Sequence, residues 1–179
     1  MIIERKKYIQ QLLDSRHNKL VKVITGIRRC GKSFLLFNLF KSQLKSEGID
    51  SKHIIEMAFD DFGNRKYRNP DKFYKYIKSL IQDDKMYYIP NADVYVTGSN
   101  AKFLSKDIIT EFRGRGFQIH VSPLSFSEFM SAYQGTKEEG WTEYLQYGGL
   151  PPVVLQPTAE GKTMLLKDLW KETYLIDIL

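Results

Sequence analysis

The sequence predicts an α/β fold built around a largely parallel sheet. Short apolar segments rich in β-branched residues alternate with longer segments whose apolar residues recur at helical spacing. A glycine-containing turn at 26–33 joins the first strand-like segment to the first long helical one. The chain has 179 residues, 42% of them hydrophobic and 27% charged, which is the size and composition of one globular domain with a small appendage.

Five segments are predicted as strands because each is short, apolar and bounded by turn residues. They span residues 20–25, 54–59, 86–89, 94–97 and 117–121. The polar stretch 60–69 is expected to be a loop. Helices are expected at 4–13, 32–45, from 70 onward, after Ser125, at 140–147 and from 161 onward.

Local start signals support two of these helices. Asn69 is a suitable N-cap, and Pro70 stands at the first helical position, where its missing N–H has no cost. Ser125 and Glu128 form a capping-box pattern, with Leu124 placed as a hydrophobic staple. We therefore expect a core at 1–124 and a helical extension at 125–179, which forms a lid or the start of a C-terminal domain.

The end of the chain lacks the usual signals for a terminus. The last predicted helix is still apolar at Leu175, Ile176, Ile178 and Leu179 and has no stop signal. We expect the chain to be a fragment that continues into a further domain.

Composition and charge narrow the classes of function. The net charge of +6 suits an anionic ligand, and DNA is left open as a partner because Arg65-Lys66-Tyr67-Arg68 is basic and aromatic, although a solvated loop is the favoured interpretation. With one cysteine and no apolar run of about 18 residues, a cytoplasmic protein without a membrane span is expected. The three histidines show no metal-ligand spacing.

The strongest functional motif is a complete G-x-x-x-x-G-K-[ST] phosphate loop. It occupies Gly26-Ile27-Arg28-Arg29-Cys30-Gly31-Lys32-Ser33 and stands after a predicted strand and at the start of a helix. The glycines let backbone N–H groups converge on phosphate oxygens at the positive end of the helix. Lys32 is expected to reach the β- and γ-phosphates, and Ser33 to bind Mg²⁺. The contact set is expected to extend to Phe34, with ATP and Mg²⁺ as ligands.

Cys30 lies inside this loop, where a helix N-terminus can stabilise a thiolate. No catalytic base is recognisable beside it, so we favour the interpretation that it is a residue of suitable size and not a nucleophile.

Four segments together resemble the prokaryotic AAA-type ATPases of the AAA_14 group, which are often joined to a C-terminal DUF4143 domain. They are the phosphate loop with its strand (23–33), residues 94–100, Gly114-Arg115 with 123–129, and residues 147–151. The resemblance covers nearly the whole chain. It implies a P-loop NTPase fold of three α/β/α layers, with a five-stranded sheet in the order 51432. It also implies Mg²⁺-dependent ATP hydrolysis coupled to a conformational change.

The resemblance assigns further residues to catalysis. Asn100, with Ser99 beside it, corresponds to the sensor that orients the attacking water; a strand-end cap is the alternative. Arg115 and Arg113 are arginine-finger candidates that act across a subunit or domain boundary; a solvated turn is the alternative. A homo-oligomer is therefore a possible assembly.

The acidic Walker B pair of this family is missing from the sequence. Met86-Tyr87-Tyr88-Ile89 begins like that strand, but Pro90 follows at once. Only four residues then precede the strand at 94–97, whereas a parallel crossover needs about a dozen residues. We expect that residues are absent between Tyr87 and Asn91.

Asp60 and Asp61 are the acidic residues to consider as replacements for the missing Walker B pair. In a 51432 sheet their strand would lie about 14 Å from the first strand, at ~4.8 Å per strand, which is too far to share one Mg²⁺. We therefore interpret both as turn or edge residues. Two alternative functions stay open: a P-loop phosphotransferase (a kinase), and a DNA-binding module that uses nucleotide as a structural ligand.

Overall fold

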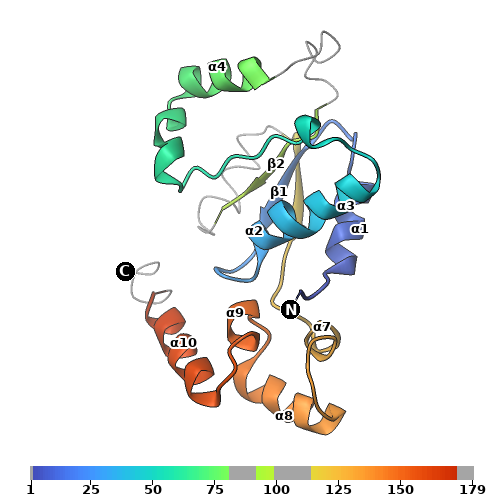
Figure 1. The fold of residues 1–179 in the computed structure, drawn as a ribbon, viewed down its shortest axis with the longest axis vertical. Coiled ribbons are helices and arrows are strands. Elements are labelled where there is room, and N and C mark those ends of the chain that lie inside the picture. The colour runs from blue at the N-terminus through green and yellow to red at the C-terminus, as the bar shows by residue number, and fades with distance from the viewer. Residues whose placement is uncertain (1, 81–91, 99–113, 173–179) are drawn as a thin grey trace.

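The computed structural model describes residues 2–80, 92–98 and 114–172 of the chain. These residues form a small parallel sheet with helices beside it, and a helical extension at one end of the molecule (Figure 1). The elements of the first part are α1 (Lys6–Asp14), β1 (Val21–Thr25), α2 (Lys32–Phe34), η1 (Leu35–Phe40), α3 (Lys41–Ser46), η2 (Ser51–His53), η3 (Phe62–Arg68), α4 (Pro70–Leu80), β2 (Tyr95–Thr97) and β3 (Gly116–His120). The extension contains α7 (Phe126–Met130), α8 (Lys137–Tyr147), α9 (Pro151–Val154) and α10 (Ala159–Lys171).

The described sheet has three strands in the order β2-β1-β3, all parallel. Thr25 at the end of β1 pairs with His120, and Val21 at its start pairs with Gly116. The order matches the 5-1-4 edge of the expected 51432 sheet, so three of the five predicted strands are found. The predicted strand at 86–89 lies outside the described residues.

The prediction of a strand at 54–59 is wrong for this structure. Those residues run extended without joining the described sheet, and they are tied down by other contacts. Lys41 of α3 forms an ion pair of 2.5 Å with Glu56, and the Phe59 ring lies 5.3 Å from that of Phe73 in α4. An apolar run alone does not show which backbone partner will be available, and the burial expected for this run is not found, since Ile55 and Phe59 are exposed.

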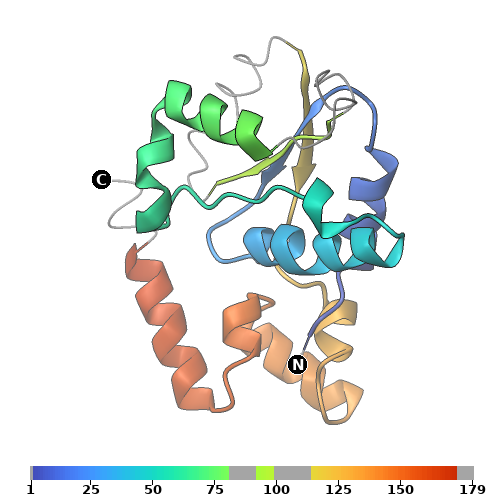
Figure 2. The same cartoon turned by 45° about the horizontal axis from the view of Figure 1, so that its top comes forward.

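The stretch 60–69, expected as a loop, contains the 3-10 helix η3. It is followed by α4, which begins at Pro70 as predicted. Tyr67 of η3 and Tyr76 of α4 place their rings 4.3 Å apart, which joins the two elements. Figures 1 and 2 show this pair, in green, on the side of the sheet away from the helical extension.

The main core lies where α1 and the helix after the phosphate loop meet the sheet. Its buried residues come from six elements or loops: Tyr8, Leu12, Ile24, Cys30, Leu35, Leu36, Phe40, Ile119 and Val121. The helix predicted at 32–45 is confirmed as a continuous helical run, α2-η1-α3, whose middle section has π-helical hydrogen bonding. Burying this stripe fixes the helix against β1 and β3, and so fixes the loop between them.

One buried charge in the sheet was not predicted. Lys22, in the middle of β1, is fully buried and forms an ion pair with Asp93, and its ammonium lies 5.5 Å from the centre of the Tyr95 ring. A buried ammonium needs such a partner, because desolvation of an isolated charge is very costly. Lys22 thereby ties the start of β2 to β1.

The helical extension begins with the predicted capping box. Ser125 accepts a hydrogen bond from the Glu128 backbone N–H, while the Glu128 carboxylate accepts one from the Ser125 N–H at 2.8 Å. Leu124 and Phe129, the predicted staple, are both buried.

A second capping box begins α8 three residues earlier than predicted. Thr136 and Glu139 make the same reciprocal hydrogen bonds, so the helix begins at Lys137 and not near residue 140. It ends at Tyr147 before Gly148, as expected. The short helix α9 was not predicted, although Pro151 and Pro152 suit its first positions.

Candidate functional site

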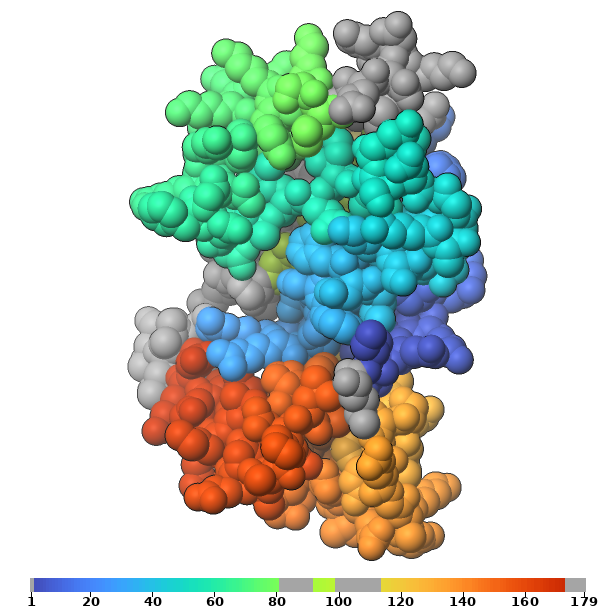
Figure 3. Space-filling view, viewed as in Figure 1, coloured from blue at the N-terminus to red at the C-terminus, as the bar shows by residue number. Residues whose placement is uncertain are grey.

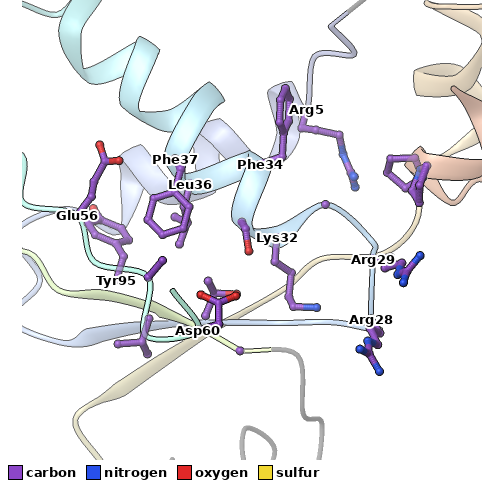
Figure 4. Close-up of a pocket in the computed structure, with 18 of the residues that line it drawn as sticks. Arg5, Arg28, Arg29, Lys32, Phe34, Leu36, Phe37, Glu56, Asp60 and Tyr95 are labelled. Atoms are coloured by element: carbon purple, nitrogen blue, oxygen red, sulfur yellow. The ribbon is translucent and has the colours of Figure 1, made fainter. Parts of the chain in front are cut away.

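A pocket of about 910 Å³ lies beside the phosphate loop (Figure 4). Four parts of the chain line it: the loop and α2, the N-terminal segment with Ile3 and Arg5, the extended segment 55–60, and the end of β2. Leu124, at the end of the core, and Pro151, Pro152 and Leu155 of the helical extension also line it. On the face shown in Figure 3 the extension lies below the rest of the chain, and the segment around 54–80 lies above the loop.

Two glycines give the loop its shape. Gly26 has a φ of +141°. A Cβ placed there would lie 2.1 Å from the carbonyl oxygen of Val121, the residue directly after β3. Gly31 has a φ of +94°, and the Leu35 N–H donates to its carbonyl at 2.8 Å, which starts the helix. Side chains at either position would require a different backbone path. The predicted roles of both glycines in turning the chain therefore have a geometric basis.

Lys32 is folded back onto the loop. Its ammonium donates to the carbonyl oxygens of Gly26 at 2.8 Å and Ile27 at 2.7 Å, and lies 3.8 Å from the Cys30 sulfur. The residue is only 6% exposed. A buried ammonium thus stands within the turn of the loop, at the position where the sequence predicts that phosphate oxygens bind.

The remaining loop residues differ in their surroundings. Ser33, Phe34, Arg28 and Arg29 all line the pocket. Arg29 adopts a φ of +64° and forms an ion pair of 3.1 Å with Glu172, just beyond α10. This contact connects the phosphate loop with the last described part of the helical extension.

Cys30 is fully buried below the loop. Burial raises the pKa of its thiol, although the nearby cations of Lys32 and Arg5 act in the opposite direction. The neutral thiol is therefore the form that this environment favours, which supports its interpretation as a packing residue.

Arg5, which the sequence analysis did not single out, connects three parts of the site. Its guanidinium donates to the carbonyl of Ser122 at 2.8 Å and to that of Cys30 at 3.4 Å, and pairs with Glu128 at 2.8 Å. The residue is 5% exposed. One buried cation thus links the loop to the first helix of the extension. A basic residue before an amphipathic helix gave no sequence signal for this role.

Asp60 lines the same pocket as Lys32 and Ser33, a position that its interpretation as a turn or edge residue did not include. The expected distance of about 14 Å rested on a strand at 54–59, and the structure has no strand there. Asp61 does behave as a turn residue, because its carboxylate accepts a hydrogen bond from the Gly63 N–H at 2.8 Å and caps η3.

Of the other predicted catalytic residues the structure describes only Arg115, which does not line the pocket. Arg115 lies directly before β3, and its carbonyl accepts a hydrogen bond from the Val21 N–H at 2.8 Å. Because the strands are parallel, this position is at the opposite end of β1 from the phosphate loop. Asn100, Ser99 and Arg113 lie outside the described residues, as do Tyr87 to Asn91, where residues were expected to be absent.

Membrane-spanning helices and metal-binding clusters are both absent from the described residues. None of their helices is long and apolar enough to cross a membrane. Within the same ranges no three His, Cys, Asp or Glu side chains gather as a metal cluster.

Comparison with known families gives one match. The model of a family described as "AAA domain", AAA_14, matches residues 18–90 and 68–130, which together include the phosphate loop, the described sheet and the first helix of the extension.

Curated relatives are similar over most of the chain. An uncharacterized protein of Haemophilus influenzae is 30% identical over 191 residues, with 92% of this chain and 48% of the relative covered. An uncharacterized protein of Methanocaldococcus jannaschii, MJ1544, is 27% identical over 173 residues, with 83% of this chain and 39% of the relative covered. The chain thus spans about half or less of the length of these relatives. No solved structure matches.

The first alignment also bears on the length of the chain. Its 191 residues exceed the 179 of the whole chain, so the H. influenzae protein carries residues that have no counterpart here. This is compatible with the expectation of absent residues, but does not locate them.

Proposed function

Because the chain belongs to the AAA_14 family of AAA domains, we propose that it binds ATP with Mg²⁺ at the phosphate loop and hydrolyses it. The single observation that carries the proposal is the buried Lys32 ammonium, held by the carbonyls of Gly26 and Ile27 beside a pocket of about 910 Å³. The resemblance noted from the sequence supports the same activity.

The pocket has two chemically different parts that suit the two parts of ATP. Lys32, Ser33, Arg28 and the loop backbone offer cationic and hydrogen-bonding groups for the triphosphate. Ile3, Pro151 and Leu155 offer apolar surface for a flat base. The structure suits Mg²⁺ as well, because the Ser33 hydroxyl and the Asp60 carboxylate that line the pocket are oxygen ligands of the kind this ion prefers.

Within this proposal the residues of the chain have separate tasks. The Lys32 ammonium turns from the loop carbonyls to the phosphate oxygens and stabilises the charge that develops on them. Ser33 holds the metal ion, which supplies Lewis-acid stabilisation when bound. Asn100 orients the attacking water, and Arg115 acts from a neighbouring copy or domain. We keep 1–124 as the catalytic core and 125–179 as the extension that closes the pocket.

Calorimetric titration of ATP in the presence of Mg²⁺ tests the central claim. We expect the wild-type protein to bind ATP and Lys32→Ala to lose most of this affinity, because no other side chain can place an ammonium in the loop. Lys45→Ala is the matched control, since Lys45 is exposed in α3 and does not line the pocket. Equal ATP affinity for Lys32→Ala and wild type would refute the proposal.

Phosphate release in water distinguishes hydrolysis from the alternative of a phosphotransferase. An ATPase releases inorganic phosphate without any acceptor, whereas a kinase needs one. Conversion of ATP to ADP only after addition of a small acceptor, with the phosphate found on the acceptor and not released, would replace hydrolysis by group transfer while leaving nucleotide binding in place.

A further inference from the structure

We propose that Asp60 supplies a carboxylate that binds the Mg²⁺ of bound Mg·ATP. The inference rests on the proposed function and adds a residue to the same site. It starts from the position of Asp60, at the end of the extended segment that forms one wall of the pocket. Figure 4 shows its carboxylate directed into the pocket, on the side where Lys32 lies.

The two acidic residues that line this pocket differ in their partners. Glu56 is neutralised by Lys41 of α3, at 2.5 Å. Asp60 pairs with no lysine, arginine or histidine of the described residues: the Lys32 ammonium is turned to the loop carbonyls, and Arg29 is held by Glu172. The pocket therefore presents one carboxylate whose charge is not compensated within the described part of the chain.

An uncompensated carboxylate beside a triphosphate is unfavourable unless a cation stands between them. A divalent ion bound to both groups converts this repulsion into attraction. Mg²⁺ in nucleotide sites is held by one or two carboxylates together with the phosphates and water, so it does not require a cluster of protein ligands. Asp60, in the same pocket as Ser33, supplies one such carboxylate.

A second, independent observation also points to polar ligands at this wall. The Thr97 hydroxyl, at the end of β2, is buried and has no hydrogen-bond partner among the described residues. Thr97 lines the pocket together with Asp60 and Ser33. A buried hydroxyl without a partner is costly, and a water bound to the metal ion would satisfy it.

The adjacent Asp61 provides a matched control. Asp61 does not line the pocket, and its carboxylate is occupied as the cap of η3. Asp60→Asn and Asp61→Asn both remove one negative charge from the same turn, and asparagine keeps the ability to cap a helix. Only the first substitution changes a group that faces the pocket.

The experiment is calorimetric titration of ATP with Mg²⁺ and again in EDTA, for wild type and both variants. We expect Mg²⁺ to strengthen ATP binding to wild type and to Asp61→Asn. In Asp60→Asn this strengthening is expected to fall by about 10–100-fold, as for other lost partners of a metal site. Its affinity for ATP in EDTA is expected to be equal to wild type or higher, because a repelling charge has been removed.

The outcomes separate this inference from the proposed function. If wild type binds Mg·ATP and Asp60→Asn retains the full effect of Mg²⁺, the inference is wrong and the proposed function stands. If wild type binds no nucleotide, both are wrong.

A measurement on wild type covers the case in which Asp60→Asn fails to fold. Fe²⁺ replaces Mg²⁺ in the presence of ADP, and ascorbate with peroxide then generates radicals that cut the backbone beside the bound metal. We expect nucleotide-dependent cuts, mapped by mass spectrometry, near residue 33 and at 59–61. Cuts near 33 without any at 59–61 would overturn the inference.

Discussion

Cys30 shows how the surroundings of one side chain decide its chemistry. From the sequence it stands in the phosphate loop before a helix N-terminus, where thiolates are often stabilised. In the structure its side chain points into the core among residues such as Ile24 and Val121, and this burial outweighs the two nearby cations and raises the pKa of the thiol. The sequence could not show which side of the loop the sulfur occupies, because that depends on tertiary packing.

The raised pKa predicts that the Cys30 thiol reacts slowly with disulfide reagents. At pH 7 to 8 Cys30 should react with a disulfide reagent much more slowly than free cysteine, and the rate should rise at a higher pH than for the free amino acid. Both the slower rate and its rise at higher pH follow because burial disfavours the thiolate, which is the reacting form. Cys30 is the only cysteine, so absorbance of the released thiol reports it alone. A rate equal to that of free cysteine at pH 7 would contradict this account.

At the scale of elements, the helix caps show what local sequence can and cannot reveal. Ser125 with Glu128 was recognised as a capping box and is confirmed. Thr136 with Glu139 follows the same pattern and was missed, so the start of α8 was placed too late. The signal was present in the sequence, but the apolar spacing that marks a helix begins only later in α8.

Loss of this cap should destabilise the protein measurably. Thr136→Ala should lower the free energy of unfolding in urea by about 0.5–2 kcal/mol, because the Glu139 backbone N–H loses the hydroxyl that accepts its hydrogen bond. Thr163→Ala is the control, since the Thr163 hydroxyl donates to a carbonyl within α10 and caps nothing. Equal effects of the two substitutions would show that the box does not stabilise α8.

The stability that the capping box of Thr136 and Glu139 gives to the protein is expected to depend on pH. Hydrogen bonds from the Thr136 backbone and side chain lower the pKa of Glu139. Because the Glu139 pKa is lowered in the folded state, its hydrogen bonds add fully to the free energy of unfolding above the ordinary glutamate pKa. That stabilisation is lost as the pH falls through the lowered pKa. The difference between wild type and Thr136→Ala should therefore shrink at acid pH.

For the whole molecule, the sequence predicted well what depends on local pattern. The α/β class and the phosphate loop between β1 and α2 follow from apolar period and glycine position, whereas the order of β2 and β3 beside β1 was implied by the family resemblance. Asp60 was placed wrongly because its position depends on whether residues 54–59 join the sheet, which is a non-local property. Arg5 was missed for a similar reason, since its three partners lie 25 to more than 115 residues away in sequence.

The position of Arg115 makes a prediction about assembly. It lies at the far end of β1 from the pocket, so a role in hydrolysis requires a second copy. Arg115→Ala should keep ATP affinity and lose turnover, because such a contact acts in the transition state.

Mixing two inactive variants tests this arrangement. When Arg115→Ala is combined with Lys32→Ala, some sites should pair an intact Lys32 with an intact Arg115 of the neighbour, and phosphate release should return in part. Each variant alone at the same total concentration is the control. Full turnover by Arg115→Ala alone would refute the role.

The contacts of Lys32 also affect how its substitution must be interpreted. The loop is cross-linked in this structure by the same ammonium that is proposed to hold phosphate, through the carbonyls of Gly26 and Ile27. Nucleotide binding is then an exchange of partners, and its heat reflects the difference between two sets of hydrogen bonds and not the sum of the new ones. Removal of Lys32 is therefore expected to loosen the loop without nucleotide as well as with nucleotide bound. The melting temperature of Lys32→Ala without nucleotide is the reference from which its lost affinity must be judged.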